Sequence, residues 1–190
     1  HHAKTSDDEA KWIAEGVRAL HDGGIRYRDM AVLYRAHYAS RPVEEAFLRA
    51  EIPHAVYSGV PFYGRKEIKD SLAYLRLVAY QDDLSFMRVA NVPKRNLGQR
   101  RMAFLKDYAE AHACSLFQAL EQTIEDEIFK RTKAKQLVAL VRKFRGSFEG
   151  RPVSEVLAAL INESGYEQAL RTEGSQERLD NVAELKQSIY

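Results

Sequence analysis

A short basic stretch, residues 35–41, has side chains of the kinds that bind phosphate groups. Arg35, His37 and Ser40 stand in it, and Pro42 suits the first position of the helix that follows. A helix N-terminus offers unpaired N–H groups and partial positive charge, so basic side chains beside it favour an anion. The stretch therefore predicts an anion site, while His37 is equally compatible with a surface histidine that binds nothing.

A second basic stretch, Asn91 to Arg101, surrounds a turn that opens a helix at Gly98. Its basic residues are Lys94, Arg95, Arg100 and Arg101. Residues 88–151 hold fourteen Lys and Arg against seven Asp and Glu, whereas residues 152–190 hold three against seven. A local basic face is typical of a protein that binds phosphates. A solvated helix surface gives the same pattern, so charge alone leaves both interpretations open.

A third basic run follows three acidic residues, Glu125 to Glu127. Its members are Lys130, Arg131, Lys133 and Lys135. Opposite charges in this order favour pairing along a helix. We therefore assign this run to solubility first.

Residues 59–66 approximate a nucleotide-binding phosphate loop but lack its chemistry. That loop needs small residues, a lysine and a hydroxyl that binds Mg²⁺. Arg65 and Lys66 stand at the lysine and hydroxyl positions, and Phe62 and Tyr63 crowd the loop. We expect an aromatic-anchored loop that packs against its own domain. No catalytic residue and no metal site is predicted anywhere in the chain, because the acidic clusters lack ligand spacing.

Two short apolar runs predict buried strands, Met30 to Tyr34 and Ile52 to Tyr57. A helix from Pro42 to Ala50 lies between them, so the strands should be parallel and joined by a right-handed crossover. Strand, polar turn and helix form the beginning of an α/β domain, and ligands meet such domains at the carboxyl ends of the strands.

The pattern changes from mixed α/β to helices alone near residues 81–83. We expect a mostly α chain with a small α/β part in residues 1–80 and an all-helical domain in residues 81–190. The helices expected after the boundary are Leu84 to Ala90, Gly98 to Ala113, Leu116 to Thr123, Ile128 to Arg145, Val153 to Ser164, Tyr166 to Arg171 and Glu177 to Ser188.

Composition narrows the class of protein. The chain has 190 residues, 45% of them hydrophobic, which is enough for a sizeable core. Its single cysteine, Cys114, excludes an internal disulfide and fits a reducing cytoplasm. No long apolar run or signal-peptide pattern is present, so we expect a cytoplasmic protein without membrane contact. The sequence does not begin with Met, which suggests a piece of a longer protein.

A series of short motifs, in order and spacing, resembles the second motor domain of the UvrD/PcrA/Rep-type superfamily 1 DNA helicases. The similarity extends over nearly the whole chain, and its specificity lies in the series. The motifs are Tyr34-Arg35, Ser40-Arg41, Glu44-Glu45, Ile52-Pro53, Phe62-Tyr63, Arg65 to Asp70, Tyr74 to Arg76, Asn91 to Arg95 and Arg178 to Leu185.

The resemblance implies a partial, incomplete RecA-like motor domain in residues 1–80, with further strands beyond Tyr190, and a mobile helical domain inserted after it. The parent would hydrolyse ATP with Mg²⁺ between two motor domains and unwind DNA in the 3′-to-5′ direction. This chain would hold no ATP site and would be inactive alone. Its partners would be single-stranded DNA, the duplex junction and repair or replication proteins.

The resemblance also assigns roles to the two basic stretches. Arg35 and Ser40 match the family pattern for phosphate contacts with single-stranded DNA, and His37 stands where the family commonly has Asn. Residues 91–101 resemble a helix-hairpin-helix variant that grips duplex phosphates without reading bases. The duplex set is Lys94, Arg95, Asn96, Gly98, Gln99, Arg100 and Arg101, in which Asn96 replaces a glycine of the family pattern.

Two other functions remain open. The helical part could be a regulatory or protein-interaction domain, which predicts little DNA affinity and an exposed apolar patch. The parent could also be a helicase-nuclease subunit. A cluster of nuclease carboxylates elsewhere in the full protein would decide between this function and a helicase without nuclease activity.

Overall fold

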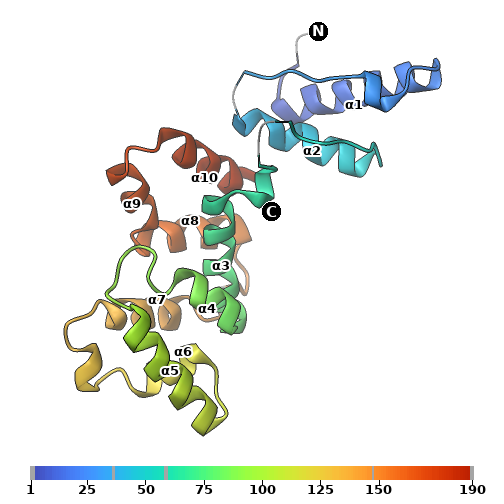
Figure 1. Ribbon diagram of the computed structural model, residues 1–190. Helices are drawn as coiled ribbons and strands as arrows, with labels where there is room; N and C mark the ends of the chain where they lie inside the picture. Colours follow the sequence, from blue (N-terminus) through green and yellow to red (C-terminus); the bar gives the residue numbers. More distant parts are fainter. Residues whose placement is uncertain (1–2, 36, 58–59, 147, 189–190) are drawn as a thin grey trace. The chain divides into compact units, whose positions relative to one another are not determined.

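The computed structural model describes residues 3–35, 37–57, 60–146 and 148–188. The chain divides into two compact units, His1–Arg65 and Lys66–Tyr190. This division concerns compactness alone. The assignment of residues 1–80 to a motor domain and of residues 81–190 to an inserted domain stays a prediction. We describe each unit by itself (Figure 1).

The first unit is built on two helices that pack against each other. Its α-helices are α1 (Ser6–Asp22) and α2 (Ser40–Arg49), and its 3-10 turns are η1 (Tyr27–Asp29), η2 (His37–Ala39) and η3 (Phe62–Gly64). The Thr5 hydroxyl caps α1 by accepting the Asp8 N–H at 3.1 Å, and acidic residues fill the first turn. Ala14, Phe47 and Ile52 form the buried centre of this small core.

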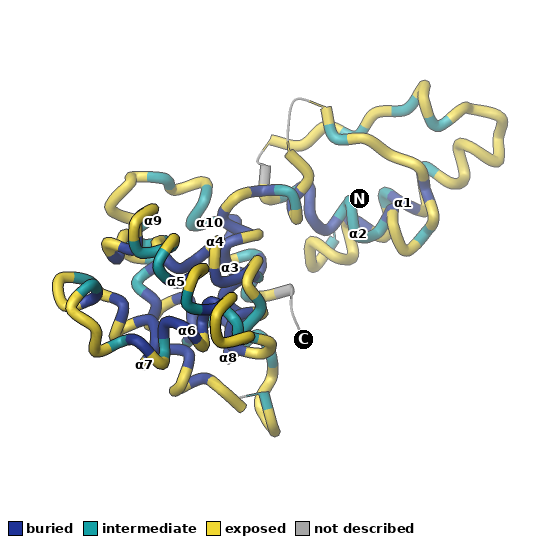
Figure 2. The backbone as a smooth tube through the Cα atoms, turned by 60° about the horizontal axis from the view of Figure 1, so that its bottom comes forward, coloured by how far each residue is buried: buried dark blue, intermediate teal, exposed yellow. Residues whose placement is uncertain are grey.

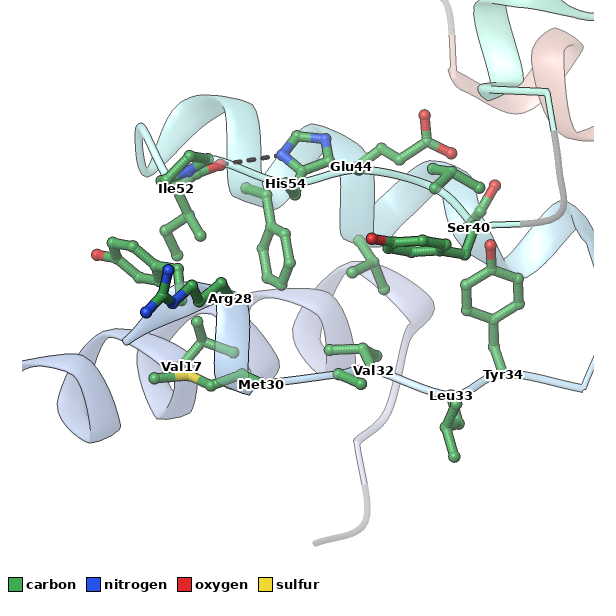
Figure 3. Close-up of a pocket in the computed structure, with 18 residues that line it drawn as sticks. Val17, Arg28, Met30, Val32, Leu33, Tyr34, Ser40, Glu44, Ile52 and His54 are labelled. Carbon is green, nitrogen blue, oxygen red and sulfur yellow. Dashed lines mark hydrogen bonds between the residues drawn. The ribbon is translucent and has the colours of Figure 1, made fainter. Parts of the chain in front are cut away.

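The expected α/β part is wrong, because no β-strand occurs in the described part of the chain. Residues 30–34 and 52–57 are extended but form no ladder with each other. Figure 3 shows side chains of Val32, Leu33 and Tyr34 pointing alternately to opposite sides, as in a strand. The apolar runs predicted buried strands, but Ile52 is the only buried residue in the two segments. A strand also needs a hydrogen-bonded neighbour, and the described residues of this unit supply none.

A cavity of about 800 Å³ lies within the first unit. Both extended segments and α2 line it (Figure 3). The segments also leave large apolar side chains in solvent, since Leu33 is 93% exposed and Tyr57 is 92% exposed. The parallel pair and its crossover are therefore replaced by two separate extended segments over a helical hairpin.

Among the described residues of the second unit, all regular secondary structure is helical. Its helices are α3 (Lys66–Tyr80), α4 (Asp83–Val89), α5 (Gln99–His112), α6 (Leu116–Gln122), η4 (Glu127–Phe129), α7 (Ala134–Phe144), α8 (Val153–Glu163), α9 (Tyr166–Thr172) and α10 (Gln176–Ser188). Several starts follow sequence signals directly. Ser115 and Gln118 form a reciprocal capping box at α6, and the Asp82 carboxylate accepts the Ser85 N–H at the start of α4.

Helix α3 is the central element of this unit. It contacts α4, α7, α8 and α10, and its Ile68, Tyr74 and Leu77 side chains are fully buried. Buried backbone positions gather where α3, α6, α7 and α8 meet (Figure 2). Full burial of each large apolar side chain contributes roughly 1.5–3 kcal/mol, so this helix anchors the unit.

Buried polar groups also fix α3 against its neighbours. The Asp70 carboxylate accepts from the Tyr166 hydroxyl at 2.9 Å and from Arg88 Nε at 2.8 Å. The Glu67 carboxylate accepts from Asn181 Nδ2 at 2.6 Å. Burial and the nearby Asp70 charge raise the pKa of Tyr166 well above its ordinary value, so its hydroxyl stays a donor. These bonds join α3 to α4, α9 and α10.

Candidate nucleic-acid interface

The first predicted site lies at the start of α2. Arg35 is exposed, whereas Ser40 is only 1% exposed. The Ser40 hydroxyl accepts a hydrogen bond from Arg65 Nη2 at 3.0 Å. His37 lies in the turn η2, and its side chain is outside the described residues. Arg35 is therefore the member of this set that the structure leaves open to a ligand.

Arg65 holds this turn together from within the first unit. Its guanidinium also donates from Nε to the Val60 carbonyl at 3.3 Å and lies over the Phe62 ring. Arg41 pairs with Glu45 at 2.9 Å. The turn is thus a packed polar cluster with one exposed arginine at its edge.

The segment of residues 59–66, which approximates a phosphate loop in sequence, has no space for a nucleotide in its described part. Gly59 lies outside the described residues, and the described part is filled by the fully buried Phe62. The Phe62 N–H donates to Glu44 Oε2 at 3.3 Å, and the Tyr63 hydroxyl donates to Glu45 at 2.9 Å. This is the aromatic-anchored loop that the sequence predicts. Its residues do not fit ATP or Mg²⁺.

The second predicted site is the loop of residues 91–98 and the start of α5. Asn91 organises the loop, because its Oδ1 accepts the backbone N–H groups of Arg95 at 2.8 Å and Leu97 at 3.1 Å. Asn96 adopts a φ of 62°, in the left-handed region that Asn tolerates better than most residues. Asn96 can therefore adopt the backbone conformation of this turn at the position where the family pattern has glycine.

Arg95 is not exposed, although the sequence places it among basic surface residues. It is 4% exposed, and its guanidinium lies inside the second unit. Nη2 donates to the Tyr74 hydroxyl at 2.8 Å and to the Ser164 carbonyl at 3.1 Å. Nη1 donates to the carbonyl oxygens of Val89, Ala90, Val92 and Pro93, at 3.0 to 3.4 Å.

This arrangement makes Arg95 the anchor of the loop rather than a group that reaches a ligand. Tyr74 is part of it, because its hydroxyl donates to the Val92 carbonyl and accepts from Arg95. Burial raises the pKa of Tyr74 despite the opposing charge of Arg95, so the hydroxyl keeps its proton. The buried guanidinium of Arg95 thus holds the loop backbone in place through these hydrogen bonds.

The remaining members of the duplex set divide into exposed and structural residues. Lys94, Gln99 and Arg100 are exposed. Arg101 is half-buried and ties the loop down, with Nε donating to the Ile128 carbonyl at 2.7 Å and Nη1 to the Asn96 carbonyl at 2.9 Å. Gly98 is the N-cap of α5 and has an ordinary φ of −80°.

The charge at the start of α5 is the reverse of what stabilises a helix. Its first turn contains no acidic residue but holds Arg100 and Arg101. Basic side chains at the positive end of the helix dipole are unfavourable unless an anion lies nearby. The backbone N–H groups of Gln99 and Arg100 also have no backbone partner among the described residues. These features suit a phosphate group from outside the protein.

Sequence reasoning missed a neighbour of this loop. Asn96 Nδ2 donates to the Arg131 carbonyl at 3.3 Å, and the Lys133 N–H donates to the Arg95 carbonyl at 3.0 Å. Residues 128–133 therefore lie beside the loop, far from it in sequence. The basic run was visible in the sequence, but its place beside residues 94–101 depends on the tertiary structure.

In the ranges that the structure describes, no three His, Cys, Asp or Glu side chains gather as a metal site would require. No described helix has the length and hydrophobicity of a membrane span.

The sequence matches the family of UvrD-like helicase C-terminal domains over residues 1–190. The chain belongs to this family. The chain is 34% identical to the ATP-dependent DNA helicase PcrA of Staphylococcus aureus over 189 residues, and equally to PcrA of Staphylococcus epidermidis. The alignments cover 96% of this chain and 26% of each relative, so the chain spans about a quarter of their length. The family resemblance read from the motifs is confirmed.

Proposed function

We propose that this chain is the DNA-contacting helical part, together with the start of the second motor domain, of an ATP-dependent helicase that unwinds DNA in the 3′-to-5′ direction. The family match and the similarity to PcrA proteins, which are ATP-dependent DNA helicases, support the class of parent protein. ATP and Mg²⁺ would bind elsewhere in the parent, since the described part of the loop at residues 60–66 does not fit a nucleotide.

Within the chain, we propose that the loop of residues 91–98 and the first turn of α5 grip the phosphate backbone of duplex DNA. The observation that carries this is the uncompensated positive start of α5, with Arg100 exposed in its first turn and Lys94 exposed on the hydrogen-bonded loop before it. A rigid loop loses little conformational entropy when a phosphate binds. Arg95 and Arg101 support the loop, and Arg35 is the proposed contact to single-stranded DNA.

The test is binding of the 190-residue chain to a fluorescent duplex with a 3′ single-stranded tail at several salt concentrations. The double variant Lys94→Ala/Arg100→Ala is compared with a control, Lys69→Ala/Lys106→Ala, which removes the same charge from exposed positions outside the loop. Each lost phosphate contact lowers the log-log salt slope by about 0.9. We expect a slope flatter by about 1.8 for the loop variant and no comparable change for the control. Equal slopes for both variants would refute the grip.

A protein-interaction function has one specific observation in its favour. Tyr80, Leu84 and Met87, near the junction of α3 and α4, are 73%, 76% and 45% exposed. Exposed apolar groups of this size mark interaction surfaces in other proteins. If this surface binds a repair or replication protein, Leu84→Glu should abolish that binding while DNA affinity stays the same. Loss of DNA affinity in this variant would count against a separate protein surface.

A further inference from the structure

Two basic segments, distant in sequence, lie side by side in the second unit. Three hydrogen bonds join them: Arg101 Nε to the Ile128 carbonyl at 2.7 Å, Asn96 Nδ2 to the Arg131 carbonyl at 3.3 Å, and the Lys133 N–H to the Arg95 carbonyl at 3.0 Å. All three involve backbone groups of the second segment, so its side chains are not used in the connection.

The side chains of the second segment fall into two classes. Lys130 pairs with Glu127, and Lys135 pairs with Glu125 at 2.6 Å. These pairs satisfy the expectation of charge pairing. Arg131 and Lys133, in contrast, are exposed and have no ion-pair partner among the described residues.

The combined face is strongly basic. In residues 94–101 the exposed basic side chains are Lys94 and Arg100, Arg101 is half-buried, and no residue is acidic. Residues 125–135 contain four basic and three acidic residues. Two of those three carboxylates, on Glu125 and Glu127, are already paired within their own segment. Asp126 alone remains to offset Arg131 and Lys133. Such a concentration of unpaired cations on a fixed surface raises the local potential and attracts a polyanion.

We infer that Arg131 and Lys133 form a second phosphate-contacting segment, so that one duplex backbone lies across residues 94–101 and residues 131–133 together. This inference rests on the proposed duplex grip and extends it to a surface that the sequence assigned to solubility. A duplex is the partner that fits, because its phosphates repeat along the backbone and can meet cations from two adjacent segments at once. No base contact is involved, so binding does not depend on DNA sequence.

The experiment compares three double variants of the 190-residue chain: Arg131→Ala/Lys133→Ala, Lys94→Ala/Arg100→Ala and the control Lys69→Ala/Lys106→Ala. All remove two exposed positive charges. Binding to a blunt duplex is measured between 50 and 200 mM salt, and far-UV circular dichroism checks that each variant is folded. Loss of two contacts flattens the salt slope by about 1.8, so the affinity lost over this salt range shrinks about twelvefold.

The outcomes separate the inference from the proposed function. A flatter slope in both site variants supports both. If only Lys94→Ala/Arg100→Ala changes the slope, the loop grips DNA and the second segment is overturned. If only Arg131→Ala/Lys133→Ala changes it, residues 131–133 contact DNA without the loop, and both the loop grip and the shared surface are overturned. If neither variant differs from the control, both are refuted.

A second probe distinguishes DNA from an acidic protein. Poly-glutamate labelled with the same dye is titrated against the same variants. If Arg131→Ala/Lys133→Ala loses poly-glutamate binding but keeps the wild-type duplex slope, the surface binds acidic protein and the DNA inference is overturned. Retained poly-glutamate binding together with a flattened duplex slope supports the inference.

Discussion

Replacing Arg95 should strongly destabilise the second unit rather than merely weaken DNA binding. The side chain is 4% exposed and donates to five carbonyl oxygens and one hydroxyl. In Arg95→Ala these acceptors lose their donor in a space that water does not reach. Arg95→Lys should fail nearly as badly, because one ammonium cannot reach the acceptors that both ends of the guanidinium fork serve.

The magnitude follows from the number of acceptors that the guanidinium can satisfy at once. Its two terminal nitrogens carry four hydrogens, so at most four strong bonds exist at any moment. Leaving a buried acceptor unsatisfied costs about 1–3 kcal/mol, and such losses are not additive. Removal of a buried charged partner typically destabilises by about 3–5 kcal/mol. We expect a loss of about 4 kcal/mol, a large fraction of the 5–15 kcal/mol that stabilises an ordinary domain.

The assay uses the distribution of chromophores between the two units. Trp12, the single tryptophan, lies in α1, so its fluorescence reports on the first unit. Far-UV circular dichroism reports mostly on the second unit, which holds most of the helices. With a urea m-value of about 2 kcal/mol/M, the circular dichroism midpoint should fall by about 2 M. The Trp12 transition should not move by a comparable amount.

The result that would refute this reasoning is equally specific. If Arg95→Ala unfolds at the wild-type urea concentration but shows a flatter DNA salt slope, Arg95 is a phosphate contact and not an anchor. In that case Arg95→Lys should keep the slope, since a lysine supplies the same charge to a phosphate.

Three further outcomes are expected. Asn91→Ala should leave two loop N–H groups without their side-chain acceptor. We expect weaker duplex binding in a titration and a loss of about 1–3 kcal/mol in the free energy of unfolding, measured with urea. Wild-type values in both assays would contradict the loop's dependence on Asn91. Tyr166→Phe removes a donor from buried Asp70 and should cost about 1–3 kcal/mol by the same assay, and a neutral effect would mean that water replaces the hydroxyl. The hydrogen bond from Lys186 lowers the pKa of Glu167, so Glu167 stabilises the fold above the ordinary glutamate pKa of about 4.3 and loses that effect as the pH falls through its lowered folded-state pKa. The difference in melting temperature between wild type and Glu167→Gln should therefore vanish in acid, and a constant difference from pH 7 to pH 3 would exclude this linkage.

Local signals predicted the helices well where a cap or a glycine marks their ends. Residues 98–113 were expected to be helical and α5 is Gln99–His112, and residues 153–164 were expected where α8 is Val153–Glu163. The expected helix of residues 128–145 is shorter, because η4 and a turn precede α7. Helix ends that are marked by a cap or a glycine depend on residues nearby in the sequence, so the sequence alone can predict them.

The errors concern features that depend on distant partners. The runs at residues 30–34 and 52–57 have the composition of strands, but strand pairing needs a neighbour that this unit does not provide. Arg95 was placed on the surface because a basic residue in a basic stretch is usually exposed. Its burial requires the Ser164 carbonyl in the α8–α9 turn and the hydroxyl of Tyr74, and no local pattern indicates them. The neighbouring position of Arg131 was hidden for the same reason.

The bond between Arg95 and the Ser164 carbonyl spans 69 residues, and it has a consequence for the order in which the molecule assembles. The ribosome synthesises all the basic residues of the loop before the α8–α9 turn. The loop cannot take its final conformation until that turn has left the ribosome and packed against it. Contacts between distant residues form late, because the intervening chain must first be ordered. A nascent chain that stops short of Ser164 therefore carries every charge of the loop without its shape. Its affinity for DNA would be that of a flexible polycation, and the rigid grip would arise only at the last stage of folding.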